Sequence, residues 1–386
     1  MWLSKVLLYI FVALFLSCGT SGMIDINNIE RERVVSRANL LVDEQPVTIT
    51  AYPATRSSGG IHDFYSEGDY WWPDPENPDG PYIRKDGMTN PDNFTKHREV
   101  MRRFSIQVPA LVAAFAITGD QKYSKSAVRH LHAWFIAPDT RMTPNLLYAQ
   151  AIKGRVTGRG IGIIDTIHLV EIARSTRVLA EYNAINSRDL EAVKDWFKSY
   201  LEWMTTHEFG ISERDNGNNH STCWAMQVAA YADLLDNEEQ KEFVRVFYKT
   251  VLLPEQMDKS GGFPRELERT KPYNYSLFNL DAMTMVCQIL STERDNLWEY
   301  RTSDGRNIKM AVDFMFPYIK NKSEWPYAPD VMYFDLWPVR HPALLFAGLA
   351  FGEEKYISLW QELNPDPENN EVIRNFPIRQ PVIWLN

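Results

Sequence analysis

The hydrophobic positions from about residue 97 onward recur at the three-to-four-residue spacing of helices that bury one face. Val108, Leu111, Val112 and Phe115 follow this spacing, and so do the apolar side chains between residues 193 and 204. The same pattern predicts further helices over 121–136, 164–183, 219–235, 238–252, 275–291, 306–320 and 341–362. No run with the alternation of a β-strand separates them, so consecutive helices are expected to pair as hairpins. We therefore predict an all-α fold, an incomplete α/α toroid built from helical hairpins.

The segment from residue 52 to residue 93 differs in composition from the helical part. It is rich in Pro, Gly, Asp and aromatic residues, which neither a helix nor a strand accommodates over this length. Its aromatic content argues against disorder, so we expect an ordered loop. Such a loop could wrap the ring, but its charged residues favour a lid or wall of a substrate site, with binding residues His62, Tyr65, Trp71 and Trp72.

Residues 1–22 have the layout of an export signal. Lys5 precedes an apolar run over residues 6–16, which is too short for a permanent membrane-spanning helix. Cys18 lies where a bacterial lipoprotein signal carries its lipidated cysteine, and ordinary cleavage within residues 19–22 is the alternative. We expect an exported protein of the bacterial periplasm or outer membrane, which meets the membrane only through a lipid on Cys18.

Composition and charge narrow the class of the exported part. Without residues 1–22 the chain keeps 40 basic and 50 acidic residues, a net charge of −10. This balance excludes a broad basic surface, so we expect no nucleic-acid partner, and a polyanion would have to meet a local cluster of cations. The proportions of hydrophobic and charged residues are those of a globular protein, and residues 23–386 are expected to form one domain. Cys223 and Cys287 lie in apolar helical patterns and are expected to be buried thiols, with one disulfide as the alternative.

Two segments combine polar groups with the start of a helix. In ERDNGNNHSTCWAMQ, one Asn is explained as an N-cap, whereas the neighbouring Asn and His have no structural requirement there. In GGFPRELERTKPYNYSLFNLDAM, basic groups precede a helix, where they oppose its dipole unless an anion compensates them. The second segment therefore predicts an anion site. The residues concerned are Asn218, Asn219 and His220 in the first segment, and Arg265, Arg269, Lys271, Tyr273 and Tyr275 in the second.

These residues carry a resemblance to a known family. Asn219 with His220, and Arg269 followed six residues later by Tyr275, resemble the Asn-His and Arg-Tyr signatures of alginate lyases with an α/α toroid fold. YWWPDPENPDGPY and DGMTNPDNF resemble the N-terminal part of the same family, in the branch that holds alginate and glucuronan lyases. The resemblance implies a polysaccharide lyase that cleaves an acidic polysaccharide, alginate or glucuronan, by β-elimination.

The chemistry of β-elimination explains these residue types. The C5 proton of a uronate is too weakly acidic while the adjacent carboxylate keeps its charge, so we expect Asn219 and Arg269 to neutralise that charge. Tyr275 and His220 can serve as base and acid, and the configuration at C5 decides which of them is the base. Because these groups supply every step, we expect no metal and no cofactor. Further substrate contacts are expected from Asn218, Arg159, Arg265, Lys271 and Tyr273.

Two other functions remain open from the sequence. A toroidal glycoside hydrolase would need two carboxylates across the scissile bond, and Asp69, Glu213 and Glu266 could supply them. A surface lipoprotein that only binds glycans would fit Cys18 and the aromatic residues. Formation of a double bond in the product distinguishes a lyase from both.

Overall fold

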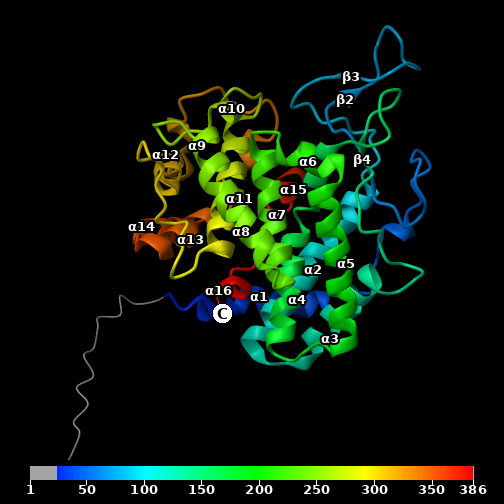
Figure 1. Ribbon diagram of the computed structural model, residues 1–386, viewed down its shortest axis with the longest axis horizontal. Coiled ribbons are helices and arrows are strands. Elements are labelled where there is room, and N and C mark those ends of the chain that lie inside the picture. Colours follow the sequence, from blue (N-terminus) through cyan, green and yellow to red (C-terminus); the bar gives the residue numbers. More distant parts are fainter. Residues whose placement is uncertain (1–23, 386) are drawn as a thin grey trace, which may run out of the picture.

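The computed structural model describes residues 24–385, so the predicted signal at residues 1–22, with Cys18, lies outside the described residues. The described chain is mostly helical (Figure 1). Its α-helices are α1 Ile26–Leu41, α2 Lys96–Thr118, α3 Gln121–Phe135, α4 Leu169–Glu181, α5 Ser187–Thr206, α6 Glu208–Arg214, α7 Asn219–Leu234, α8 Glu238–Phe247, α9 Leu253–Gln256, α10 Pro264–Leu267, α11 Pro272–Leu290, α12 Ile308–Lys320, α13 Pro342–Phe351, α14 Glu354–Glu362, α15 Asn370–Arg374 and α16 Val382–Leu385. A π-helical turn, Tyr248–Leu252, joins α8 to α9, and short 3-10 turns lie at Ile49–Ala51, Gly160–Thr166, Lys322–Glu324 and Phe334–Leu336.

The helices sort into an inner and an outer set by the distribution of their apolar side chains. Helices α7, α11 and α13 are buried on nearly every side, whereas α3, α5 and α8 bury one face and expose the other. A helix that is apolar all round must be covered on all sides, which places it inside. Helices α2, α4, α7, α11 and α13 pack in succession, and α3, α5, α8, α12 and α14 pack outside them (Figure 1). This arrangement confirms the predicted all-α toroid of hairpins.

Helix α2 is the core helix of the N-terminal half. Among residues 24–385 it is the one helix long and apolar enough to cross a membrane, but 78% of its apolar window is buried inside the protein. It packs against α1, α3, α4 and α16. Gly119 ends it with φ of 72°, the left-handed conformation of a helix C-cap. Its length and apolar composition are therefore explained by burial in the protein.

The aromatic segment of residues 52–93 is an ordered loop that contains short strands. Strand β1, Tyr65–Glu67, pairs in parallel with β4, Tyr148–Ala151. Strands β2, Trp71–Trp72, and β3, Ile83–Arg84, pair antiparallel and project from the helices (Figure 1). The expectation that this part lacks strands is wrong in detail, because two to four residues are too few to produce a detectable alternation of polar and apolar positions.

Helix α1 was not predicted from the sequence because a charged residue interrupts its apolar face. Glu30 is buried between Val34 and the start of the helix, where it bonds Arg33 at 2.6 Å and Arg340 at 2.8 Å. A buried carboxylate is tolerated when such cations compensate it. Helix α16 packs on α1 and α2, so the two ends of the described chain lie together.

The two cysteines of the described chain are buried free thiols. Cys223 lies on α7 and Cys287 on α11. This confirms the prediction of buried thiols, and the alternative disulfide is not formed.

Candidate active site

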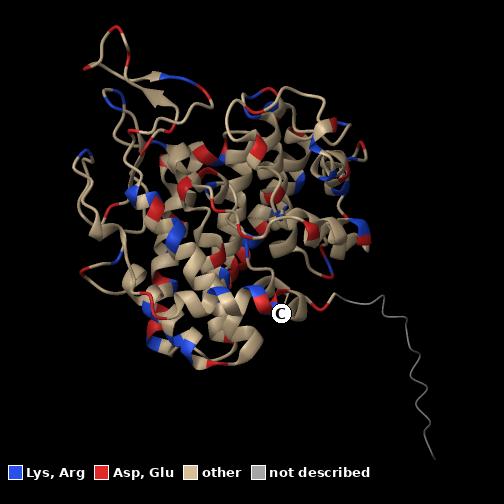
Figure 2. Ribbon diagram, turned by 180° about the vertical axis from the view of Figure 1, so that it is seen from behind, with Lys and Arg blue, Asp and Glu red and all other residues tan. Residues whose placement is uncertain are grey.

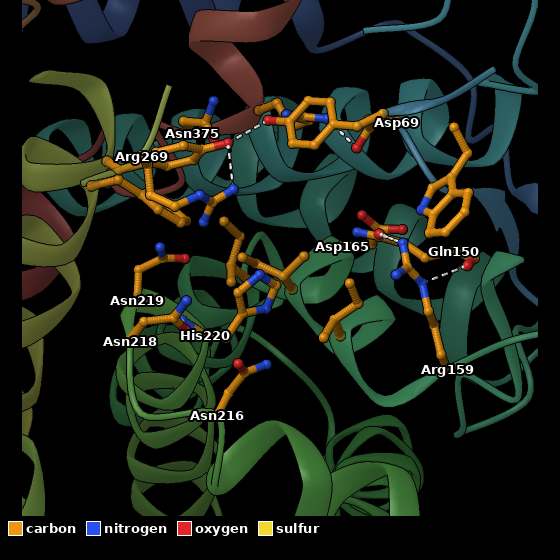
Figure 3. A pocket seen from close by; sticks show the side chains of 18 of the residues that line it. Asp69, Gln150, Arg159, Asp165, Asn216, Asn218, Asn219, His220, Arg269 and Asn375 are labelled. Carbon is orange, nitrogen blue, oxygen red and sulfur yellow. Dashed lines mark hydrogen bonds and ion pairs between the residues drawn. The ribbon is translucent and has the colours of Figure 1, made fainter. Parts of the chain in front are cut away.

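A pocket of about 300 Å³ opens between the inner helices and the aromatic segment. Five separate parts of the chain contribute to it, and seven of its residues were predicted from the sequence: Trp71, Arg159, Asn218, Asn219, His220, Arg269 and Tyr275. Figure 3 shows that Asn218, Asn219, His220 and Arg269 lie at one end of the pocket and Arg159 with Gln150 at the other. The first group is called the catalytic end below, together with Tyr275.

The N-terminus of α7 positions the Asn-His pair. Asn218 is the N-cap, and its side-chain oxygen accepts a hydrogen bond from the backbone N–H of His220 at 3.1 Å, as predicted for one Asn. Asn219 is bound twice by the buried Glu266, which accepts from its backbone N–H at 2.6 Å and from its side-chain Nδ2 at 2.7 Å. Burial raises the pKa of Glu266, and the two bonds from Asn219 oppose that rise. The side chain of Asn219 is therefore fixed, with its second Nδ2 hydrogen left for a ligand.

A buried carboxylate orients His220. The Nδ1 atom of His220 lies 2.7 Å from Oε1 of Glu213, whose side chain is fully buried in α6. A carboxylate can only accept, so Nδ1 carries the hydrogen and the lone pair of the neutral ring is on Nε2. His220 lines the pocket and keeps 17% of its side chain exposed, so this lone pair is accessible to a ligand.

Arg269 and Tyr275 form the opposite wall of the catalytic end. The Arg269 guanidinium lies 4.4 Å from the centre of the Tyr275 ring, and its Nη2 donates to the Tyr275 hydroxyl at 3.4 Å. The hydroxyl of Tyr70, on the aromatic segment, lies 2.5 Å from that of Tyr275. Burial and the neighbouring Tyr70 raise the pKa of Tyr275 well above its usual value, while Arg269 opposes the rise. Tyr275 is thus a neutral phenol in a cationic surrounding.

The anion expected beside the basic segment is supplied by the protein itself. Arg269 pairs with Asp86 at 3.2 Å, and Asp86 also accepts from Thr270 Oγ1 at 3.0 Å. Burial raises the pKa of Asp86, but the Arg269 charge and the hydrogen bonds outweigh it and hold the pKa below its usual range. Only part of the Arg269 guanidinium is used within residues 24–385. Its Nε and Nη2 donate to Asp86 and Nη2 also donates to Tyr275, which leaves Nη1 for a ligand.

The other end of the pocket carries a cation without a carboxylate. Arg159 donates to the backbone and side-chain oxygens of Gln150, both at 3.0 Å, and lies 5.9 Å from the centre of the Trp71 ring. No ion pair forms on Arg159 in the described chain, and its burial lowers its pKa to about 10. A half-buried guanidinium that is bonded only to neutral oxygens favours an anionic ligand.

An ionic network that the sequence analysis missed lies behind the pocket. Arg98 pairs with Asp69 at 2.6 Å and with Asp165 at 3.0 Å, and Arg374 of α15 pairs with Asp69 at 2.5 Å. Asp69, Asp165 and Arg374 line the pocket, as do Tyr70, Arg84, Gln150, Asn216 and Asn375. Their partners lie tens to hundreds of residues away in the sequence, so only the fold brings them together.

Six of the predicted substrate-binding residues do not line this pocket. Tyr273 is buried in an aromatic cluster with Trp325 and donates its hydroxyl to the Tyr318 carbonyl. Lys271 is buried and pairs with Glu371 at 3.1 Å. The helix start at 272 turns both side chains into the core, which is the physical reason that they miss the pocket.

The other four lie elsewhere on the surface or in the loop. Arg265 is exposed and donates to the backbone carbonyls of residues 216 and 217. Trp72 donates to the Met88 carbonyl, and His62 bonds the Arg141 carbonyl beside a different hollow. Tyr65 lines a second cavity next to the pocket.

The carboxylates proposed for a hydrolase are all engaged. Asp69 is bound by Arg98 and Arg374, Glu213 by His220, and Glu266 by Asn219. Opposed charges lower the pKa of Asp69 against the effect of its burial, so it is an ion and no proton donor at neutral pH. Among residues 24–385 no group of three His, Cys, Asp or Glu side chains is arranged to hold a metal ion.

Charge over the molecule is mixed. Figure 2 shows acidic and basic residues interspersed along the helices, without a face that carries basic residues alone. In the pocket the cations outnumber the carboxylates, since Arg84, Arg159, Arg269 and Arg374 line it together with Asp69 and Asp165. A polyanion is therefore expected to meet this chain at the pocket.

Comparison with known proteins agrees with the fold. The alginate lyase family profile matches residues 48–325. Among solved structures, an alginate lyase from Bacteroides ovatus has a TM-score of 0.78 at 29% sequence identity, over 92% of this chain and 93% of that chain. Alginate lyase A1-III from Sphingomonas species A1 has a TM-score of 0.54 at 17% identity, over 83% and 88% of the two chains. A histidine-to-alanine variant of A1-III complexed with a tetrasaccharide gives 0.56 at 17% identity, over the same shares. No curated protein sequence matches.

Proposed function

The chain belongs to the alginate lyase family and is a polysaccharide lyase. We propose that it cleaves a 1,4-linked uronate polymer by β-elimination, with alginate as the favoured substrate and glucuronan as the second choice. The observation that carries this proposal is the convergence of Asn219, His220, Arg269 and Tyr275 on one end of a single pocket. These four side chains supply the charge neutralisation, the base and the acid that the reaction needs.

The first requirement is to neutralise the uronate carboxylate. The free Nδ2 hydrogen of Asn219 and the unused Nη1 of Arg269 can both donate to it, because Glu266 and Asp86 occupy the other donors of these side chains. Donors that are fixed in advance stabilise the charge that develops as the C5 proton leaves, without reorganising in the transition state. Glu266 and Asp86 are thus positioning residues in this proposal.

The second requirement is a base for the C5 proton. His220 suits this role because Glu213 holds Nδ1 and leaves the Nε2 lone pair facing the pocket. The buried carboxylate also stabilises the imidazolium that forms when Nε2 takes the proton. For a uronate whose C5 proton lies on the opposite face, the base would have to be Tyr275.

The third requirement is an acid for the departing oxygen. Electrons from the broken C5–H bond form the C4–C5 double bond, the C4–O4 bond breaks, and O4 takes a proton. Tyr275 can give that proton because burial keeps it a phenol. Arg269, 3.4 Å away, stabilises the phenolate that remains. Before the next turnover the His220 imidazolium releases its proton to solvent and the Tyr275 phenolate takes one up. The reaction consumes no water.

The choice of substrate rests on the relatives. The protein from Bacteroides ovatus, 29% identical over nearly the whole chain, is an alginate lyase, and variants of A1-III with His replaced by Ala or Tyr by Phe form complexes with a tetrasaccharide. The cationic pocket of this chain suits an acidic saccharide. The hydrolase alternative gains no support, because Asp69, Glu213 and Glu266 are all engaged in ion pairs or hydrogen bonds.

We also propose that the enzyme is exported and anchored in the bacterial envelope through a lipid on Cys18, on the basis of the signal pattern in residues 1–22. Mass spectrometry of the mature protein tests this directly. A lipidated N-terminal Cys18 is expected, and an unmodified chain that begins after Cys18 would contradict it.

The function is tested by incubating the purified protein with mannuronate-rich alginate, guluronate-rich alginate, glucuronan, hyaluronan and pectate. Near-ultraviolet absorbance follows the conjugated double bond, and heat-denatured protein provides the blank. Absorbance should rise with alginate or glucuronan. No rise with any of the five polymers, from a protein that is folded by circular dichroism, would refute the proposal.

A further inference from the structure

A second cavity lies next to the active-site pocket, along strand β4. It has a volume of about 840 Å³, larger than the pocket. The two share this strand as a wall, because Gln150 lines the pocket whereas Ala151 and Lys153 line the second cavity. The two cavities are therefore neighbours on either side of β4.

The second cavity carries an excess of positive charge. Its charged lining consists of Arg56, Lys153 and Arg155 against a single carboxylate, Glu67. Arg56 already neutralises Glu67 at 3.0 Å. Lys153 and Arg155 have no carboxylate partner among residues 24–385, although the chain as a whole is acidic. Two uncompensated cations in one cavity of an acidic protein point to an anionic ligand.

The loop that carries these two cations is held in a defined shape. Ile152 and Val156 bridge across it, and Tyr82 donates its backbone N–H to the Lys153 carbonyl at 3.1 Å. Gly154 turns the chain with φ of 72°, at a point where an added Cβ would lie 2.8 Å from the backbone of Pro81. The backbone of the loop is therefore fixed, so little backbone freedom is lost when a ligand binds its cations.

Aromatic rings link the cations to the pocket. The Arg155 guanidinium lies 5.1 Å from the centre of the Trp71 ring, and the Arg159 guanidinium of the pocket lies 5.9 Å from the same centre. Lys153 Nζ lies 5.6 Å from the centre of the Tyr82 ring in the second cavity. Trp71 therefore lies within reach of a cation of the pocket and a cation of the second cavity, so a chain that passes over this ring can meet both.

We propose that the second cavity is a distal subsite, where Lys153 and Arg155 bind carboxylates of a uronate chain while another sugar of that chain occupies the pocket. This inference rests on the proposed function, since it assumes the same acidic polymer. It adds that the enzyme binds long chains in preference to short ones, and that the preference depends on ionic strength.

The test is the double variant Lys153→Gln/Arg155→Gln, compared with the wild type over a series of uronate oligomers of increasing length and the parent polymer. The matched control is Arg188→Gln/Lys198→Gln, which removes the same two charges from exposed positions on α5, a helix that contributes to neither cavity. KM and kcat come from the double-bond absorbance. Affinities for the same oligomers come from calorimetry on the Tyr275→Phe background, so that binding is measured without turnover.

The double variant should raise KM and Kd for polymer and long oligomers about three- to tenfold at low salt, the range expected for two solvent-exposed ion pairs. The kcat, and all values for the shortest oligomers cleaved, should match the wild type and the control. Equal affinity for long oligomers in the double variant and the control would overturn the distal subsite. Absence of turnover by the wild type would instead overturn the proposed function, and the calorimetric comparison would still decide the subsite.

Discussion

Replacing Tyr275 by Phe isolates the contribution of a single hydroxyl. The change removes the group that bonds Tyr70 at 2.5 Å and Arg269 at 3.4 Å, and it keeps the ring that Arg269 stacks on. Loss of an acid–base group slows turnover by on the order of 10²- to 10⁴-fold, about 2.7 to 5.5 kcal/mol in the barrier. The loss of stability is expected to be about 0.5–1.5 kcal/mol, the net value of a hydrogen bond, because Tyr70 is partly exposed and water can bind its hydroxyl.

The assay compares kcat of Tyr275→Phe with that of Tyr182→Phe, which removes a hydroxyl from a half-exposed ring that does not line the pocket. Denaturant unfolding and calorimetric binding of an oligomer show whether fold and affinity survive. The raised pKa of Tyr275 adds a second readout, since the wild type should keep its acid, and therefore its rate, up to at least about pH 9. Near wild-type kcat in Tyr275→Phe on every polymer cleaved would refute the assignment.

Three further predictions follow from the structure. Glu213→Gln should reduce kcat by on the order of 10²-fold or more with little change in oligomer affinity, because His220 loses the carboxylate that fixes its tautomer; an unchanged kcat would contradict this. Burial raises the pKa of Asp330 from 3.8 to about 6, so the folded state binds this proton more tightly than the unfolded state. The contribution of Asp330 to the free energy of unfolding, at most about 3 kcal/mol, is fully present below pH 4 and is lost as the pH rises through 6. Asp330→Asn should therefore flatten the unfolding free energy between pH 4 and 6, and an unaltered pH dependence would refute the reasoning. Activity should survive dialysis against a chelator, because Asn219 and Arg269 already neutralise the substrate; loss that a divalent ion restores would contradict this.

The helices and the centre of the site could be predicted because their signals are local. The spacing of apolar residues located α3, α7 and α11 to within three residues of their ends. Asn219, His220, Arg269 and Tyr275 stood out because each lies beside a helix start within a short, unusual segment. Local signals of this kind do not depend on how the chain closes in space.

The supporting residues could not be predicted because their signals are long-range. Glu213 pairs with His220 across one turn between helices, but Arg374 reaches Asp69 and Tyr70 reaches Tyr275 from more than 200 residues away. Lys271 and Tyr273 share the polar character of Arg269, yet the direction of their side chains depends on the helix that begins at 272. Composition marked the aromatic segment as part of the site. The pairing of β1 with β4, which separates the two cavities, could not be predicted, because strands this short leave no recognisable pattern in the sequence.

The central claim is that this pocket breaks a uronate chain by elimination, and oxygen-18 water tests it most directly. The protein would be incubated with alginate in this solvent, and the new chain ends would be analysed by mass spectrometry. Each cleavage should yield an unsaturated end that is one water lighter than a hydrolysed end, without solvent oxygen-18 at the bond that was broken. Fragments of full hydrolytic mass that carry oxygen-18 would contradict the account.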